Sequence, residues 1–330
     1  MLGRGFQPAL LSADPGGHVR NHFAGQFESD LLPATALGGA MQKDLSMHEQ
    51  TTLNRPEQIT LNDGSAIPQI GLGVWQVDPA ITSQVVSWGI EAGYRLIDTA
   101  EGYRNEEGVG QAIRTAGVPS SELFITSKLR NGAHQRDAAL RAFDETMNKL
   151  GIEQIDLFLI HWPVPSQGKY VEAWKTLIEL RQSGQIKSIG VSNFNQDHLE
   201  RIIGETGVTP SVNQIELHPR FQQRGIREFH STHKIRIESW SPLGSGRLLS
   251  DPTLEKIAGK HRKSVAQVII RWHLQEGLIV IPKSIHQGRI AANFDVFDFE
   301  LDAADLELIR GMDSSDGRTG PNPVTAAFLF

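Results

Sequence analysis

From Gln58 onward, short apolar runs alternate with amphipathic segments along the chain. Each run leads into a polar loop, and the segment that follows places apolar residues at helical spacing, as Leu140, Phe143 and Met147 illustrate. The predicted strands cover residues 70–74, 95–98, 123–127, 157–160, 188–191, 212–215, 237–240 and 278–281. The predicted helices cover residues 80–92, 105–116, 136–150, 171–182, 197–204, 225–234, 264–276 and 286–294. The pattern therefore indicates strand-helix units repeated along the chain.

A hairpin signal precedes these units. Two short apolar runs flank Asn62-Asp63-Gly64, and an Asp-Gly pair between apolar runs is typical of a tight β-hairpin turn. We expect this hairpin immediately before the first strand of the repeating pattern.

Strands that alternate with helices require parallel pairing and helical crossovers, and eight such units close a barrel. The predicted fold class is therefore α/β, a (β/α)8 TIM barrel with an N-terminal β-hairpin. The alternative is an open doubly wound sheet, which usually carries a G-x-G-x-x-G turn after its first strand. Gly71-Leu72-Gly73 lies inside the first predicted strand and has no third glycine in register. These glycines are more typical of close packing.

Residues 1–55 differ in composition from the rest of the chain. They are rich in Gly, Ala, Pro and Ser and show no sustained period, which predicts a disordered or non-native N-terminal extension. A transit peptide is the alternative, because two arginines precede most of the acidic residues of this segment. We expect residues 56–330 to form a single barrel domain.

Composition narrows the classes of partner. The formal net charge of -6 provides no basic field for nucleic acid or an anionic membrane, and no apolar run approaches the roughly 18 residues of a membrane span. The chain has no cysteine, which excludes disulfides, thiolate metal sites and a cysteine nucleophile. The 12 histidines form no H-E-x-x-H spacing, so no metal is expected and metal-dependent hydrolysis is a weak alternative. We expect a cytoplasmic monomer with a small-molecule substrate.

Four chemically active side chains follow consecutive predicted strands. Asp98 ends the second strand, Tyr103 lies in the loop after it, Lys128 follows the third strand and His161 follows the fourth. Alone, such an Asp is usually a turn residue, and the others are usually packing or solvated residues. Catalytic side chains in a barrel come from the carboxyl ends of several strands, so four together indicate an active site.

The chemistry of carbonyl reduction explains these residue types. Hydride transfer leaves an alkoxide that needs a proton, and a tyrosine with a pKa of about 10 is a reluctant acid near neutral pH. An ammonium about 4 Å away lowers that pKa by roughly one to three units. We therefore expect Tyr103 to act as general acid, Lys128 to lower its pKa and Asp98 to anchor the lysine. His161 would orient the carbonyl group.

Hydride transfer also requires a cofactor, because no side chain carries hydride. Trp240 offers an aromatic face for a nicotinamide ring, although core packing is an equally good explanation of this tryptophan from the residues alone. Lys283, Ser284 and Arg289 lie around the predicted start of the last helix. Two cations and a hydroxyl there suit the additional phosphate of NADP better than the ribose of NAD, whereas a solvated surface patch is the alternative.

From about residue 59 to residue 328 the sequence resembles the aldo-keto reductases, most closely the prokaryotic 2,5-diketo-gluconate reductase-like members. The matching motifs are GLGVWQV, LIDTAEGYRNEEGVG, ITSKL, DLFLIHWP, KSIGVSNF, VNQIELHP, SWSPLG and VIPKSIHQGRI. The resemblance implies an NADPH-dependent carbonyl reductase with Asp98, Tyr103, Lys128 and His161 as its catalytic tetrad.

The resemblance also implies a set of binding residues. The cofactor positions it gives are Ser192, Asn193, Gln214, Trp240, Ser241, Leu243, Lys283, Ser284, Arg289 and Asn293. Trp75 and Trp162 are implied to line the substrate pocket. His286 replaces a Thr that many members have, and Ala292 replaces a common Glu, so the preference for NADPH over NADH is less well determined than the reaction.

The chain after Asp313 is short. Members that act on bulky apolar substrates usually have a longer C-terminal lid, so we expect an open pocket for small polar carbonyls such as keto sugars or keto acids. The alternative function is an NADPH-binding regulatory protein with little turnover, as the potassium-channel β-subunits of this family illustrate.

Overall fold

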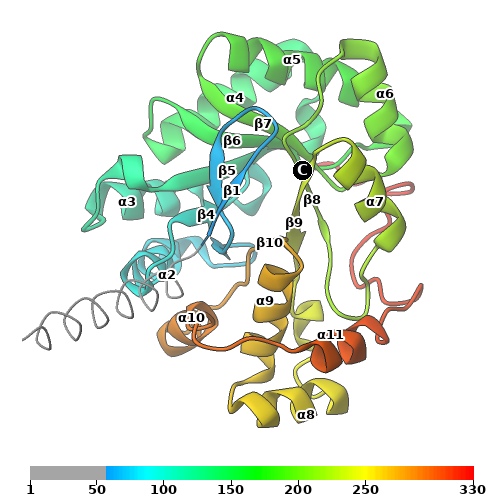
Figure 1. Ribbon diagram of the computed structural model, residues 1–330. Coiled ribbons are helices and arrows are strands. Elements are labelled where there is room, and N and C mark those ends of the chain that lie inside the picture. The colour runs from blue at the N-terminus through cyan, green and yellow to red at the C-terminus, as the bar shows by residue number, and fades with distance from the viewer. Residues whose placement is uncertain (1–56) are drawn as a thin grey trace, which may run out of the picture. The chain divides into compact units, whose positions relative to one another are not determined.

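The computed structural model describes residues 57–330, in which eight parallel strands form one sheet in sequence order (Figure 1). Each strand pairs with the one before and after it in the chain, as expected when a helix connects each pair. The strands are β3 (Gly71–Gly73), β4 (Leu96–Asp98), β5 (Phe124–Leu129), β6 (Ile155–Ile160), β7 (Ile186–Ser192), β8 (Val212–Glu216), β9 (Arg236–Trp240) and β10 (Ile279–Val280).

The two edges of this sheet meet and close it. Ile70 forms a parallel bridge with Val280, and the Val280 N–H donates a 2.9 Å hydrogen bond to the Gln69 carbonyl. The Gly73 N–H donates to the Pro282 carbonyl at 3.2 Å. The predicted TIM barrel is thereby confirmed, and the open doubly wound sheet is wrong.

The predicted hairpin is present as β1 (Gln58–Thr60) and β2 (Ala66–Pro68), which pair antiparallel. Its apolar residues close one end of the barrel interior. Leu61 and Ile67 are buried there, in one cluster with Leu96 and Phe124 of the barrel strands. The hairpin therefore fills the end of the barrel opposite to the carboxyl ends of the strands.

The helices lie around the outside of the strands (Figure 1). They are α2 (Pro79–Ala92), α3 (Glu106–Thr115), α4 (Arg136–Leu150), α5 (Tyr170–Gln182), α6 (Gln196–Thr206), α7 (Arg224–Thr232), α8 (Pro252–His261), α9 (Val265–Gln275), α10 (Gln287–Phe294) and α11 (Ala303–Arg310). The apolar face predicted for α4 is buried on the sheet, where Phe143 meets Phe158 of β6 edge to face at 5.2 Å. Of the described helices, α8 and α11 were not predicted.

The prediction for residues 1–55 lies outside the described residues. Within residues 57–330, none of the helices combines the length and apolar character that a membrane span requires.

Candidate functional site

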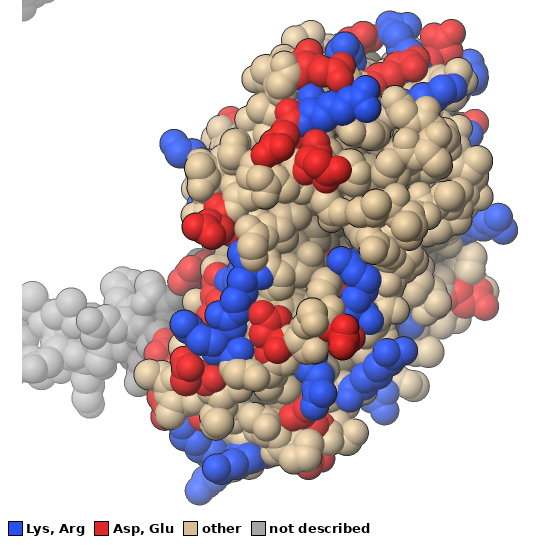
Figure 2. Space-filling view, turned by 90° about the vertical axis from the view of Figure 1, so that its right-hand side faces the viewer, with Lys and Arg blue, Asp and Glu red and all other residues tan. Residues whose placement is uncertain are grey.

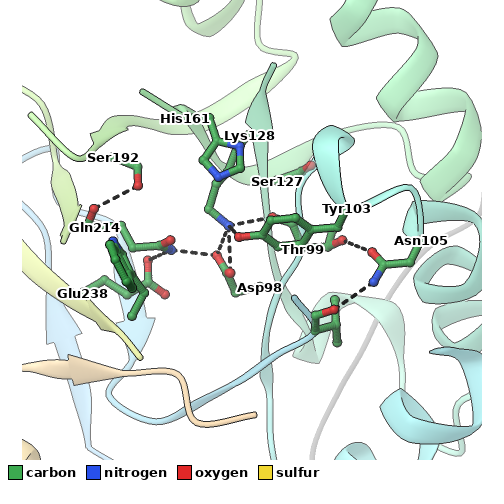
Figure 3. Close-up of polar contacts among 12 residues, drawn as sticks. Asp98, Thr99, Tyr103, Asn105, Ser127, Lys128, His161, Ser192, Gln214 and Glu238 are labelled. Atoms are coloured by element: carbon green, nitrogen blue, oxygen red, sulfur yellow. Dashed lines mark hydrogen bonds and ion pairs between the residues drawn. The ribbon is translucent and has the colours of Figure 1, made fainter. Parts of the chain in front are cut away.

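The four predicted catalytic side chains come from neighbouring strand ends and lie together at one mouth of the barrel (Figure 3). Asp98 is the last residue of β4, and Lys128 points inward from β5. Tyr103 ends the short 3-10 helix that follows β4, and His161 follows β6 directly. Because parallel strands share their carboxyl edge, residues distant in sequence become neighbours here.

Lys128 is at the centre of the hydrogen bonds in this group. Its fully buried ammonium donates to both Asp98 carboxylate oxygens, at 2.7 and 2.9 Å, and to the Thr99 carbonyl at 2.8 Å. The Tyr103 hydroxyl lies 3.2 Å from the same nitrogen. Burial is the largest single influence and lowers the pKa of Lys128. The charges of Asp98, Tyr103 and Glu238 and the hydrogen bond to Asp98 together raise it by more, so the net shift is upward and the lysine stays protonated.

The acidity of Tyr103 differs from the expectation. Burial raises the pKa of Tyr103 to about 12, and the Lys128 charge opposes that shift without cancelling it. The negative charge of Asp98 adds to the increase. The expected net lowering is therefore wrong for the protein alone, because the sequence pattern shows the lysine but does not show the cost of removing a phenolate from water.

His161 faces the Tyr103 ring edge to face at 5.5 Å. Burial and then the Lys128 charge hold the pKa of His161 well below its usual value, so its imidazole is neutral near pH 7. The Nδ1 atom of this ring has no hydrogen-bond partner among the described residues. A neutral imidazole can donate one hydrogen bond to a substrate oxygen without adding a charge to the site.

A further acid, which the sequence did not single out, lies beneath this group. The Gln214 amide donates to Asp98 Oδ2 at 2.7 Å and to Glu238 Oε2 at 2.9 Å. Burial, followed by the charge of Asp98, raises the pKa of Glu238 to about 8. Glu238 points into the barrel from β9. In the sequence it stands two residues before Trp240, and this spacing could have indicated that both side chains face the same side of the strand.

A cavity of about 1410 Å³ opens beside these residues. Its lining includes Asp98, Tyr103 and His161, whereas Lys128 is buried behind them. The predicted cofactor residues that line it are Ser192, Asn193, Gln214, Trp240, Ser241, Leu243, Lys283, Ser284, Arg289 and Asn293. The predicted substrate residues Trp75 and Trp162 line it as well.

The space-filling view shows a face of the barrel that is hollowed between two lobes (Figure 2). The floor of this hollow is mostly uncharged, and acidic and basic side chains are interspersed around it. On the face shown, the charges do not form a basic stripe of one sign, which is the usual mark of a nucleic-acid surface.

One part of the cavity wall suits a flat amide-bearing ring. The Trp240 indole N–H donates to Asn193 Oδ1 at 2.8 Å, and the Asn193 amide donates to the His161 carbonyl at 3.0 Å. The Ser192 hydroxyl donates a hydrogen bond to the main-chain carbonyl of Gln214 at 2.9 Å. These bonds fix an aromatic plane and several polar side chains along one wall, as nicotinamide recognition requires.

Another part of the wall suits phosphate. Lys283 and Arg289 are exposed at the start of α10, and neither forms an ion pair within residues 57–330. The Ser284 hydroxyl lies beside them and accepts a 3.1 Å hydrogen bond from the His286 N–H. Two cations with a hydroxyl at a helix N-terminus match the chemistry of a phosphate group.

The end of the chain forms a third wall, which the sequence analysis did not foresee. The ring of Phe330 meets His161 at 5.2 Å, and that of Phe328 meets Trp162 at 5.2 Å. Asn131 donates to the Phe328 carbonyl at 2.9 Å and holds this segment in place. A short C-terminal segment therefore still brings two aromatic rings to the mouth of the cavity.

Glu216 anchors the beginning of this segment. Its buried carboxylate accepts hydrogen bonds from the Thr319 N–H at 2.6 Å and from the Gly320 N–H at 3.1 Å. Burial alone would raise the pKa of Glu216, but hydrogen bonds from His218, Thr319 and Gly320 lower it below its usual value. A Cβ at Gly320 would come within 2.4 Å of the Trp240 ring, so the segment packs directly on the part of the cavity wall that Trp240 forms.

The chain is similar to known proteins over most of its length. The sequence profile described as "Aldo/keto reductase family" matches residues 69–314. An aldo-keto reductase of Mycolicibacterium smegmatis is 51% identical over 271 residues, 82% of this chain and 98% of that protein. The methylglyoxal reductase DkgA of Escherichia coli K12 is 51% identical over 270 residues, 81% of this chain and 97% of that protein. A solved structure of a Gox0644 variant in complex with NADPH is 55% identical with a TM-score of 0.81, covering 83% of this chain and 100% of that chain.

Proposed function

This chain belongs to the aldo/keto reductase family, and on that premise we propose that it reduces aldehydes and ketones to alcohols with NADPH, with Tyr103 as the general acid. As a member of the family it is an NADP(H)-dependent oxidoreductase. The observation that carries the proposal is the Tyr103 hydroxyl, which lies 3.2 Å from a buried ammonium at the wall of the large cavity.

Tyr103 is suited to give a proton and then to regain it. Its phenol is protonated throughout the neutral range, since its pKa is raised to about 12. The Lys128 ammonium stabilises the phenolate that remains after proton donation, and Asp98 holds the ammonium in position. His161 would donate a hydrogen bond to the substrate oxygen and orient it beside the phenol.

NADPH, when bound, supplies the hydride. The residues that would hold it are the polar side chains and the Trp240 ring along one wall of the cavity, with Lys283, Ser284 and Arg289 at the phosphate end. The Gox0644 variant was solved in complex with NADPH, and this chain carries donor chemistry that suits the same ligand. Trp75, exposed at the rim, and the buried Trp162 would contact the substrate.

The substrates proposed are small polar carbonyls, such as methylglyoxal, keto sugars or keto acids. The Escherichia coli relative is named a methylglyoxal reductase. In this chain the rings of Phe328 and Phe330 stack on each other at 5.7 Å beside the predicted acid and orienting residues, which leaves less room for large ketones.

The test combines binding with turnover. NADPH affinity is measured by fluorescence, and NADPH consumption is followed with a panel of aldehydes and ketones, for the wild type and Tyr103→Phe. We expect wild-type turnover that is fastest on small polar aldehydes and a loss of about 10²- to 10⁴-fold in Tyr103→Phe, with NADPH affinity nearly unchanged. Retained turnover in Tyr103→Phe would refute the acid assignment. Tight NADPH binding without wild-type turnover would indicate a regulatory role instead.

We also propose that the protein is a cytoplasmic monomer. The absence of cysteine in the chain and its mildly acidic charge of -6 support this proposal. Light scattering coupled to size-exclusion chromatography tests the oligomeric state, and a mass near twice the 36.4 kDa of one chain would contradict it.

A further inference from the structure

Glu238 lies outside the set of residues that could touch a ligand. It is fully buried in the middle of β9 and is absent from the lining of the cavity. In the barrel register it is paired with Gln214 of β8, and both side chains point into the interior (Figure 3). Any effect of Glu238 on the reaction must therefore pass through a neighbour.

Gln214 is that neighbour, and its amide nitrogen is fully used. One N–H donates to Asp98 Oδ2 at 2.7 Å and the other to Glu238 Oε2 at 2.9 Å. The remaining polar atom of this side chain is its carbonyl oxygen, which accepts no hydrogen bond from residues 57–330, and Gln214 lines the cavity. If the amide were flipped, its carbonyl oxygen would face the Asp98 carboxylate, which has no proton to donate, and the hydrogen bond to Asp98 would be lost.

We infer that Glu238 is a positioning residue for the reductase reaction: by accepting one Gln214 N–H, it fixes the amide so that its carbonyl oxygen is offered to the cofactor cavity. This inference rests on the proposed function, because the group that needs such an acceptor is the carboxamide of nicotinamide. Asp98 alone secures one of the two N–H groups, and Glu238 removes the rotation that would otherwise remain about that single bond.

This role requires an acceptor oxygen and no charge. The charged and titratable groups that face Glu238 are Asp98 from β4, Lys128 from β5 and Tyr103 from the loop after β4. Burial and the adjacent Asp98 keep Glu238 largely protonated near pH 7, because its pKa is raised to about 8. A neutral glutamic acid presents the same carbonyl acceptor as glutamine, which provides a matched pair of variants.

The experiment compares Glu238→Gln with Glu238→Leu. Glu238→Gln keeps an acceptor and the side-chain volume, and we expect its NADPH Kd and kcat to stay within about twofold of the wild type. Glu238→Leu removes the acceptor and leaves one Gln214 N–H unpaired, which should weaken NADPH binding by about 5- to 100-fold. With saturating NADPH, the KM for the carbonyl substrate should change little, which a general loss of structure would not produce.

A double-mutant cycle separates positioning from plain stability. In a Gln214→Leu background, Glu238→Leu should cause no additional loss of NADPH affinity, since the two residues act through one bond. Equal loss in Glu238→Gln and Glu238→Leu would overturn the inference in favour of a charge effect, and unchanged binding in Glu238→Leu would overturn it outright. If Glu238→Leu does not fold, Glu238→Met is titrated in the same way, under the same expectations.

Failure of the proposed function gives a different result. A wild type that neither binds NADPH nor consumes it with any carbonyl contradicts the reductase assignment itself. A wild type that does both, beside variants that do not separate, contradicts the role of Glu238 alone.

Discussion

The interior of the barrel has two layers that the same strands build for opposite purposes. On β4, Leu96 lies in the apolar layer that the hairpin closes, and Asp98, two residues later, lies in the polar layer at the mouth. On β8, Val212 and Gln214 are divided in the same way. Because alternate residues of a strand face the same side, residues two apart both point into the barrel, one in the apolar layer and the next in the polar layer.

The two layers differ in how they are held. Burial of each side chain in the apolar layer stabilises the folded state, and another apolar residue of similar volume can replace it at little cost in stability. In the polar layer, Lys128, Asp98 and Glu238 each lose hydration, and specific partners offset that cost. We therefore expect stability to depend mainly on the apolar layer and the proposed reaction on the polar layer, and substitutions in the two layers should separate these properties.

The largest effect is expected from Lys128→Met, which leaves Asp98 buried without its cation. We expect a loss of about 3–5 kcal/mol in the free energy of unfolding, together with at least about 10²-fold lower turnover, because the Tyr103 phenolate loses its stabilising charge. Urea unfolding and NADPH consumption measure the two effects. As a control, adding Asp98→Leu should restore part of the stability and none of the turnover. A Lys128→Met variant that is as stable and as active as the wild type would contradict the proposed difference between the two layers.

The matching change in the apolar layer is Leu157→Ala. Leu157 is fully buried in the cluster closed by the hairpin, and the cavity left by the substitution should lower the free energy of unfolding by about 2–5 kcal/mol. Turnover per folded molecule should stay within about twofold of the wild type, since no active-site bond changes. Urea unfolding and kinetics well below the transition measure this. A strong drop in kcat would show that the layers are coupled.

The pH dependence sharpens the comparison, because burial raises the pKa of Tyr103 to about 12. Below that pH the phenol is protonated, so reduction should be nearly independent of pH over about 6 to 9. Alcohol oxidation needs the phenolate as base, and its rate should rise by up to about tenfold per pH unit in the same range. Initial rates in both directions test this. An oxidation rate that falls with rising pH would contradict the assignment of Tyr103.

A smaller effect is expected at Glu216, where the polar layer meets the C-terminal segment. Glu216→Gln keeps one acceptor oxygen and loses the charged oxygen pair that accepts from Thr319 and Gly320. We expect this to weaken the attachment of the C-terminal segment by about 1–3 kcal/mol. The segment should become more sensitive to carboxypeptidase, and the preference for small aldehydes should weaken. Thr319→Val, which removes only one hydroxyl, is the milder control. Equal protease resistance in Glu216→Gln and the wild type would contradict the anchoring role.

The sequence predicted the barrel, and it predicted that the four candidate catalytic residues would lie together, because both follow from local pattern. Apolar runs ending in polar residues mark parallel strands, and all four predicted catalytic residues lie where those strands end. The two helices that were missed, α8 and α11, directly follow Asp251 and Asp302, whose side chains cap them. Those caps could have revealed them.

What the sequence could not show depends on closure and burial. Glu238 follows Ile235, Arg236 and Ile237 in an alternating apolar and polar pattern, like the outward residue of a half-exposed strand, and only the closed barrel shows that it points inward. The return of Phe328 and Phe330 to the mouth is a long-range contact that no local period encodes. The pKa of Tyr103 is a balance between burial and charge, and its sign requires the coordinates.

The seam that closes the barrel has a consequence for biosynthesis. Val280 is synthesised more than two hundred residues after Gln69, yet a hydrogen bond between these two residues joins the first and last strands of the barrel. The stretch that immediately follows carries Lys283, Ser284 and Arg289. A nascent polypeptide must therefore extend past Val280 before its barrel can close, and the three side chains proposed to bind the cofactor phosphate are synthesised only after that point.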